Sequence, residues 1–117
     1  VMDKGAGRII GWPTMGQEAW VPFLAEAMAP GYTVGCSQIQ PGIIQQSDHE
    51  PFFEAGVPAF FAIQESLDYW TVYHSDLDSF DHVEKGNLDQ ACQALAATAW
   101  GFLQMPRRVP HRSIAGQ

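Results

Sequence analysis

Residues 47–65 read SDHEPFFEAGVPAFFAIQE, and this stretch contains a helix start, a helix stop and a strand. Ser47 followed by Glu50 forms the capping-box pattern, in which the two side chains satisfy amide donors at the start of a helix. Pro51 suits the first helical turn, and Gly56 suits a left-handed C-terminal cap. The pattern predicts a short helix that ends just before Gly56.

A continuous apolar run, Ala59–Ile63, follows this helix. Apolar runs of this length are typical of strands that are buried on both faces of a sheet. Two further strands are predicted: Arg8–Trp12, which is apolar and β-branched between glycines, and Tyr32–Ile39, which alternates. Because the strands alternate with helical segments, the sequence predicts an α/β fold with helices packed on a sheet.

Two longer helices are predicted. Glu18–Met28 has apolar residues at helical spacing, and Pro22 confines its regular part to a start near Val21. The second helix begins with Asn87 as its cap, has Gln90 at the reciprocal position, and stops at Pro106. Its expected apolar face consists of Leu88, Ala91, Cys92, Leu95, Ala96, Ala99, Phe102 and Leu103. Residues 64–85, which precede this helix, show neither the helical nor the strand periodicity of apolar residues. They are predicted to form a long loop of the kind that often carries function.

Composition limits the classes of function. The chain has 117 residues, of which 46% are hydrophobic and 16% charged, so one globular folding unit is expected. The net charge of −7 argues against a nucleic-acid partner, and no apolar run is long enough to span a bilayer. Residues 106–117 are set apart as a basic tail containing proline and glycine. Cys36 and Cys92 could form a disulfide or remain two buried thiols.

Residues with reactive side chains fall into three groups: Asp3, Ser47–Glu50 and Tyr73–Asp78. Ligands of α/β sheets bind beyond the carboxyl ends of strands, where such groups would lie. A metal site needs an imidazole ligand and an outer carboxylate that orients it, and His74 and Asp48 suit these two tasks. The residues alone also allow simpler roles: His74 as a loop histidine bonded to a carbonyl, and Asp48 as a helix cap.

Other chemistries find less support in the residues. A serine hydrolase would need a Gly-x-Ser-x-Gly elbow, which is absent, and Cys36 has no nearby activating base. The acidic residues 76–81 do not match a calcium-binding loop and can form a solvated loop instead. Trp70 and Tyr73 flank His74, and either line a substrate pocket or close the loop as an aromatic pair. Trp20, Trp100, Phe60 and Phe61 are expected in the core.

Three segments together resemble a known family. SDHEPFFEAGVPA, YHSDLDSFD at residues 73–81, and DKGAGRIIG at residues 3–11 are similar to the motifs of the co-catalytic di-zinc peptidases. This family includes bacterial leucyl aminopeptidases and glutamate carboxypeptidase-like enzymes. The resemblance implies a three-layer α/β/α zinc-exopeptidase fold with a mainly parallel sheet. Residues 1–105 would be the C-terminal part of its catalytic domain, and the family's frequent export points to a periplasmic or secreted location.

The resemblance also implies roles for individual residues. His74 would be the terminal imidazole ligand of one zinc ion, and Asp3 a terminal ligand of the other, although Lys4 departs from the usual motif. Asp48, His49 and Tyr73 would support the metal or line the substrate pocket, and Asp78 would orient the His74 loop. The substrate would be a peptide or a small amide, hydrolysed by a zinc-activated water.

The same resemblance leaves part of the site unaccounted for. Family members carry a His-x-Asp motif and a Glu-Glu pair upstream of this region, which supply the bridging aspartate and the catalytic glutamate. Neither is found here, so no catalytic residue is assigned, and the chain is expected to be a fragment that is inactive alone. The alternatives are a non-catalytic domain that self-associates through exposed apolar surface, and a structural α/β module that only looks like a peptidase.

Overall fold

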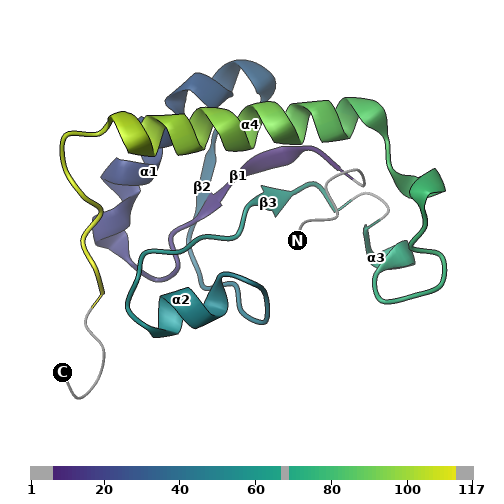
Figure 1. Ribbon diagram of the computed structural model, residues 1–117, viewed down its shortest axis with the longest axis horizontal. Helices are drawn as coiled ribbons and strands as arrows, with labels where there is room; N and C mark the ends of the chain where they lie inside the picture. Colours follow the sequence, from purple (N-terminus) through teal and green to yellow (C-terminus); the bar gives the residue numbers. More distant parts are fainter. Residues whose placement is uncertain (1–6, 67–68, 113–117) are drawn as a thin grey trace.

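The computed structural model describes residues 7–66 and 69–112. Three strands, β1 (Ile9–Pro13), β2 (Gln38–Gln40) and β3 (Ile63–Gln64), form a sheet in the order β2-β1-β3 (Figure 1). β1 pairs parallel with β2 and antiparallel with β3. The described part of the sheet is therefore mixed, and the expectation of a mainly parallel sheet is wrong there. The chain enters β3 from the opposite end of the sheet and runs antiparallel to β1.

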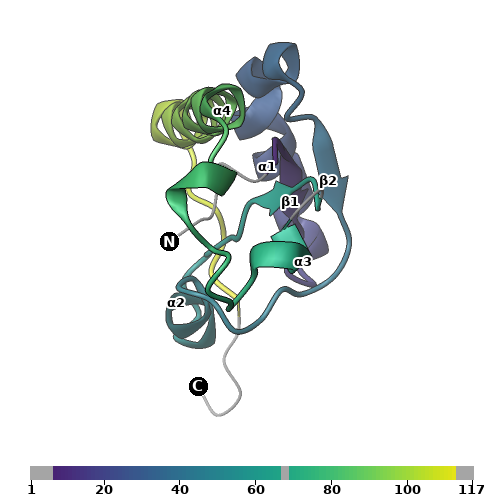
Figure 2. The same ribbon diagram turned by 90° about the vertical axis from the view of Figure 1, so that its right-hand side faces the viewer.

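Four α-helices are described: α1 (Val21–Met28), α2 (Glu50–Glu54), α3 (Tyr69–Val72) and α4 (Lys85–Gln104). Three short 3-10 segments are also described: η1 (Glu18–Trp20), η2 (Ala29–Val34) and η3 (Phe80–His82). α4 crosses the sheet above β1 and packs on α1 and η2 (Figures 1 and 2). A mixed α/β fold with a helical layer is confirmed. A second helical layer on the opposite face is not seen in the part of the chain that is described.

The predicted strands differ from the observed ones in two places. The strand predicted at Tyr32–Ile39 begins only at Gln38, because residues 29–34 continue the preceding helix as a 3-10 turn that ends at Gly35 in the left-handed region. Of the apolar run Ala59–Ile63, only Ile63 lies in a strand; Phe60 is partly buried and packs against the core, whereas Phe61 is partly buried and lines the pocket described below. Both differences arise because strand formation depends on a partner, which local pattern does not reveal.

Helix ends also depart from the predicted caps. α2 ends at Glu54, and Gly56 beyond it has the predicted left-handed conformation with φ of 83°. The N-terminal cap position of α2 is His49 rather than Ser47, and no side chain caps it. The Glu50 carboxylate instead accepts a hydrogen bond from the Gln46 amide at 2.8 Å. α4 begins two residues before Asn87, so the expected capping role of Gln90 is wrong.

Gln90 is instead buried at the junction of α4, β1 and η2. Its Oε1 accepts a hydrogen bond from the amide of Ile9 at 2.7 Å. Its Nε2 donates to the carbonyls of Ile9 at 2.7 Å and Val34 at 2.9 Å. One side chain therefore satisfies both backbone groups of a fully buried strand residue and attaches the helix to the sheet.

We predict that Gln90→Leu destabilises the protein by about 2–4 kcal/mol, because the buried polar groups of Ile9 would lose their partners. The free energy of unfolding in urea measures this effect. Gln93→Leu makes the same change on the exposed side of α4 and should alter stability by less than about 0.5 kcal/mol. Equal losses in the two variants would show that the buried amide contributes nothing special.

The core lies between β1, α1 and α4. It contains Ile9, Trp12, Leu24, Met28, Cys36, Ala62, Ala91 and Ala94. α4 approaches α1 so closely that a side-chain carbon at Gly101 would collide with the backbone of Ala27. The opposite side of α4 is exposed: Trp100, which was expected in the core, is 63% exposed and Leu103 76%. The apolar face predicted for this helix is thus split between the core and the surface.

The segment after α4 is held against the rest of the molecule. Arg107 forms an ion pair with Glu26 at 2.9 Å, and the buried indole of Trp20 donates to the carbonyl of Pro110 at 2.7 Å. Arg112 donates to the carbonyl of Phe53 at 2.6 Å and lies over its ring. The described part of the basic tail therefore contacts both α1 and α2. No helix among the described residues is long and apolar enough to cross a membrane.

Both cysteines are free thiols, so they do not form a disulfide, and only Cys36 is buried. Burial raises the pKa of the Cys36 thiol, and the neighbouring Trp12 side chain offsets this only in part. Because a raised pKa leaves less thiolate at a given pH, we predict that Cys92 alone reacts with an aromatic disulfide reagent at pH 8. The reagent's absorbance should report one fast thiol in the native protein and two in urea. Two fast thiols before denaturation would contradict this placement.

Candidate active-site pocket

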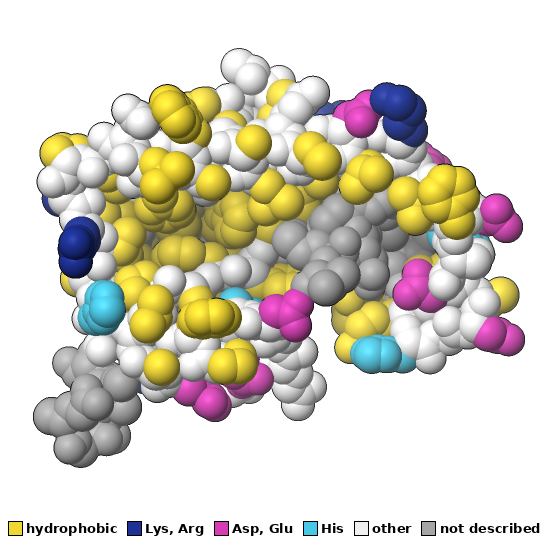
Figure 3. Space-filling view, viewed as in Figure 1, with side chains coloured by type: hydrophobic (Ala, Val, Ile, Leu, Met, Phe, Trp, Pro, Cys, Tyr) yellow, Lys and Arg dark blue, Asp and Glu magenta, His cyan; other side chains and the backbone are white. Residues whose placement is uncertain are grey.

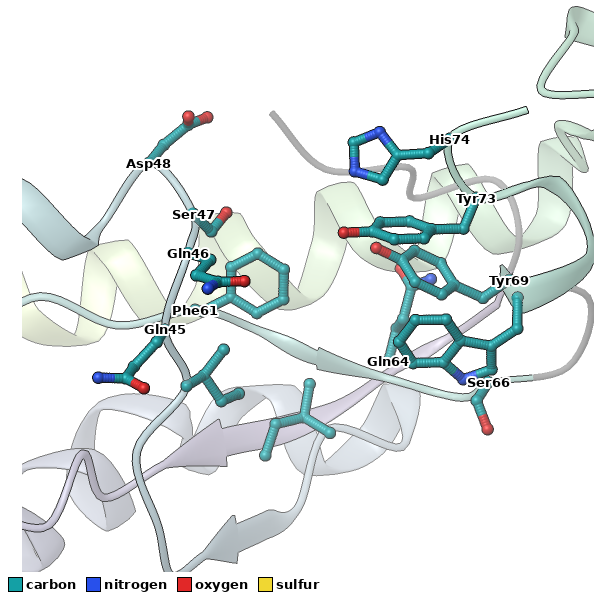
Figure 4. A pocket seen from close by; sticks show the side chains of 13 residues that line it. Gln45, Gln46, Ser47, Asp48, Phe61, Gln64, Ser66, Tyr69, Tyr73 and His74 are labelled. Carbon is teal, nitrogen blue, oxygen red and sulfur yellow. The ribbon is translucent and has the colours of Figure 1, made fainter. Parts of the chain in front are cut away.

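A pocket of about 490 Å³ opens beside β3, between the segment that leads into α2 and the segment formed by α3 and the residues after it (Figure 4). One wall is residues 44–48 and the opposite wall is residues 69–74, with β3 between them. The lining residues are Ile44, Gln45, Gln46, Ser47, Asp48, Phe61, Ile63, Gln64, Ser66, Tyr69, Trp70, Tyr73 and His74. Two of the three sequence clusters singled out for chemistry therefore face each other across one cavity.

The wall at residues 69–74 is aromatic. The rings of Tyr69, Trp70 and Tyr73 lie within 4.9–5.3 Å of one another, centroid to centroid, and Trp70 meets both tyrosines edge to face. Figure 4 shows the rings of Tyr69 and Tyr73 below His74 along one side of the pocket. Tyr69 and Tyr73 are one helical turn apart, so α3 is what places them together. Trp70 and Tyr73 line the cavity and also contact each other, so the structure is compatible both with a substrate-lining role and with an aromatic pair that closes the loop.

His74 occupies a strained backbone position at the rim. Its φ is 50°, in the left-handed region that residues other than glycine seldom adopt. Among the described residues, three non-glycine residues have positive φ, and two of them, Gln46 and His74, line this pocket. The rings of Tyr73 and His74 form a T-shaped pair, with their centroids 4.0 Å apart. Backbone strain of this kind persists where the surrounding structure imposes it, and it concentrates at binding and catalytic sites.

Asp48 and His49 are neighbours in sequence, but only Asp48 lines the pocket. The Asp48 carboxylate projects at the rim, across the pocket from His74 (Figure 4). His49 is only 8% exposed and does not line the pocket. Its Nε2 bonds the carbonyl of Ile44 at 2.7 Å, and its ring packs beside Phe61. His49 thus fixes the wall at residues 44–48 from behind.

We predict that His49→Phe, which keeps the ring but removes the bond to Ile44, destabilises the protein by about 1–2 kcal/mol. Urea denaturation gives the free energy of unfolding for comparison with wild type. His111→Phe is the matched control, because His111 is exposed, and its stability should match wild type. A loss no larger than in the control would mean that the His49 bond does not support the pocket wall.

The remaining candidates lie elsewhere. Asp78 is exposed and outside the pocket lining; its amide donates to the carbonyl of Ser75 at 3.2 Å. None of the hydrogen bonds among the described residues involves the Asp78 carboxylate. Its predicted role in orienting the His74 loop therefore stays a prediction. Asp3 lies outside the described residues. Sequence reasoning missed Tyr69 as a lining residue, although its one-turn spacing from Tyr73 was a usable signal.

The donors of the described residues do not make up a zinc site by themselves. No group of three or more His, Cys, Asp or Glu side chains in residues 7–66 and 69–112 could hold a metal ion. The His74 imidazole and the Asp48 carboxylate are donor types that zinc accepts, but zinc takes at least three protein ligands. Further ligands would have to come from outside the described residues.

A family model settles the relationship that the motifs indicated. The model of peptidase family M28 matches residues 14–99, which is most of the chain and includes every pocket residue. The chain belongs to peptidase family M28. This membership confirms the resemblance to the co-catalytic zinc peptidases and a metal-dependent, peptidase-like origin. Neither the curated proteins nor the solved structures contained a match to the chain.

Proposed function

We propose that this chain supplies a substrate pocket and one zinc ligand, His74, to a metal-dependent exopeptidase of the aminopeptidase or carboxypeptidase type. The observation that carries the proposal is the strained His74 at the rim of an aromatic pocket, within the segment that matches the M28 family. In a complete site, zinc would activate a water molecule and polarise the scissile carbonyl. Asp3 is proposed as a ligand of the second zinc on its motif alone.

The residues of this chain have separate tasks in such a site. The aromatic wall receives a substrate side chain and excludes water from it. Tyr73 forms a T-shaped contact with the imidazole of His74, and this contact restricts the orientation of the imidazole. Asp48 lies on the opposite side of the opening, where its carboxylate can orient an incoming peptide or a bound ligand (Figure 4).

We also propose that the chain does not hydrolyse peptides on its own. The described residues do not assemble three metal donors, and the sequence has no Glu-Glu pair to provide a proton-transferring glutamate. A single imidazole binds zinc weakly compared with a three-ligand site. Weak binding at His74 and no turnover are therefore expected together.

A zinc titration of the 15N-labelled protein, followed by NMR, tests the ligand assignment. The imidazole signals of His74 should shift or broaden first, and His74→Ala should weaken zinc binding at least about tenfold, while His111→Ala should not. A parallel assay with leucine p-nitroanilide should show no hydrolysis. Zinc binding that is unchanged in His74→Ala would overturn the ligand role, and turnover by the isolated chain would overturn the stated inactivity.

The second candidate, a self-associating domain without catalysis, is favoured by one specific feature. Residues 90–104 of α4 contain no charged side chain, yet part of this segment faces solvent, including Trp100 and Leu103. Figure 3 shows apolar side chains along α4 and in the hollow beneath it. A contiguous apolar surface of this kind promotes association.

We predict that Leu103→Lys abolishes any dimer formed by the wild-type chain, because a charge would then have to be buried in the contact. Sedimentation equilibrium at micromolar concentrations gives the mass of both proteins. Gln104→Lys adds the same charge at a neighbouring exposed polar position as a control. A wild-type chain that sediments as a monomer removes this candidate.

A further inference from the structure

The charges of this chain are divided along the sequence. Residues 9–84 carry 11 of the 13 acidic side chains and none of the six Lys and Arg. Every residue that lines the pocket falls within this range. A cleft surrounded by charge of one sign raises the local concentration of ligands of the opposite sign. The described residues that line the pocket therefore lie in a stretch of sequence whose Asp and Glu side chains are not balanced by any Lys or Arg.

The lining residues show the same bias toward negative charge. Among the lining residues that the structure describes, Asp48 is the only carboxylate, and none is a Lys or Arg that could pair with an anionic ligand. On the opposite wall the rings of Trp70 and Tyr73 are 70% and 42% exposed, so a ligand can reach them. The faces of aromatic rings attract cations that lie within about 6 Å of the ring centre, and tryptophan does so most strongly.

We propose that the pocket binds the cationic side chain of a lysine or arginine residue in a peptide. The inference rests on the proposed function, and it narrows the substrate class of the same site. The apolar stem of the side chain lies along Phe61 and Ile63, its charged end reaches the aromatic wall, and Asp48 adds attraction from the other wall. A glutamate or aspartate side chain would place a second carboxylate in the same pocket as Asp48, and the two like charges would repel each other.

The test compares lysinamide with norleucinamide by NMR titration of the 117-residue protein at pH 7 in low salt. Both ligands carry an α-ammonium group and a side chain of similar length, so only the side-chain charge differs. Lysinamide should bind about three- to tenfold more tightly, with the largest amide shifts at residues 69–74. Equal affinities, or shifts confined to another part of the protein, overturn the inference.

Two pairs of variants locate the selectivity. Trp70→Leu and Asp48→Asn should each reduce the preference for lysinamide, and the double variant should bring it close to one. Trp100→Leu and Glu54→Gln make the same chemical changes at exposed positions outside the pocket lining and should leave the preference unchanged. A preference that survives in the double variant contradicts the proposed site. The zinc titration reads His74 alone, so loss of the lysine preference and loss of the zinc ligand are separate outcomes.

Discussion

The hydrogen bonds of Gln90 attach the long helix α4 to the central strand β1. Its amide bonds both backbone groups of Ile9, as a neighbouring strand would, and so α4 is attached to the first residue of β1. Ile9 is also the residue that pairs with Gln64 of β3, and Gln64 lines the pocket. Gln90 and Ile9 therefore connect the helix, the central strand and the strand beside the pocket.

Local signals in the sequence were sufficient where an element is determined by its own residues. Pro22 marked the start of α1 correctly, and Gly56 ended α2 in the left-handed conformation, because these constraints act within a few residues. These signals failed where the role of a residue depends on a partner far away in the sequence. Gln90 resembled a capping residue, but its partners are Ile9 and Val34, and no local rule identifies contacts at that separation.

The candidate site shows the same division. Motifs identified Asp48, Tyr73 and His74, and the structure brings all three to one pocket. The motifs placed His49 beside them, but the structure turns its ring away from the cavity to bond Ile44. The aromatic wall was only partly recognised, because residues 64–85 have no long period and the single turn of α3 is too short to give one.

The contacts that complete this fold join residues that are far apart in the chain. Gln90 lies 81 positions after Ile9, and the bond between Trp20 and Pro110 spans 90 positions. Structures dominated by such contacts fold slowly, because a long loop must close before any contact stabilises it. During synthesis, β1 and α1 leave the ribosome long before the residues that cover them. Their apolar surfaces remain available to chaperones until α4 and the segment after it have been translated.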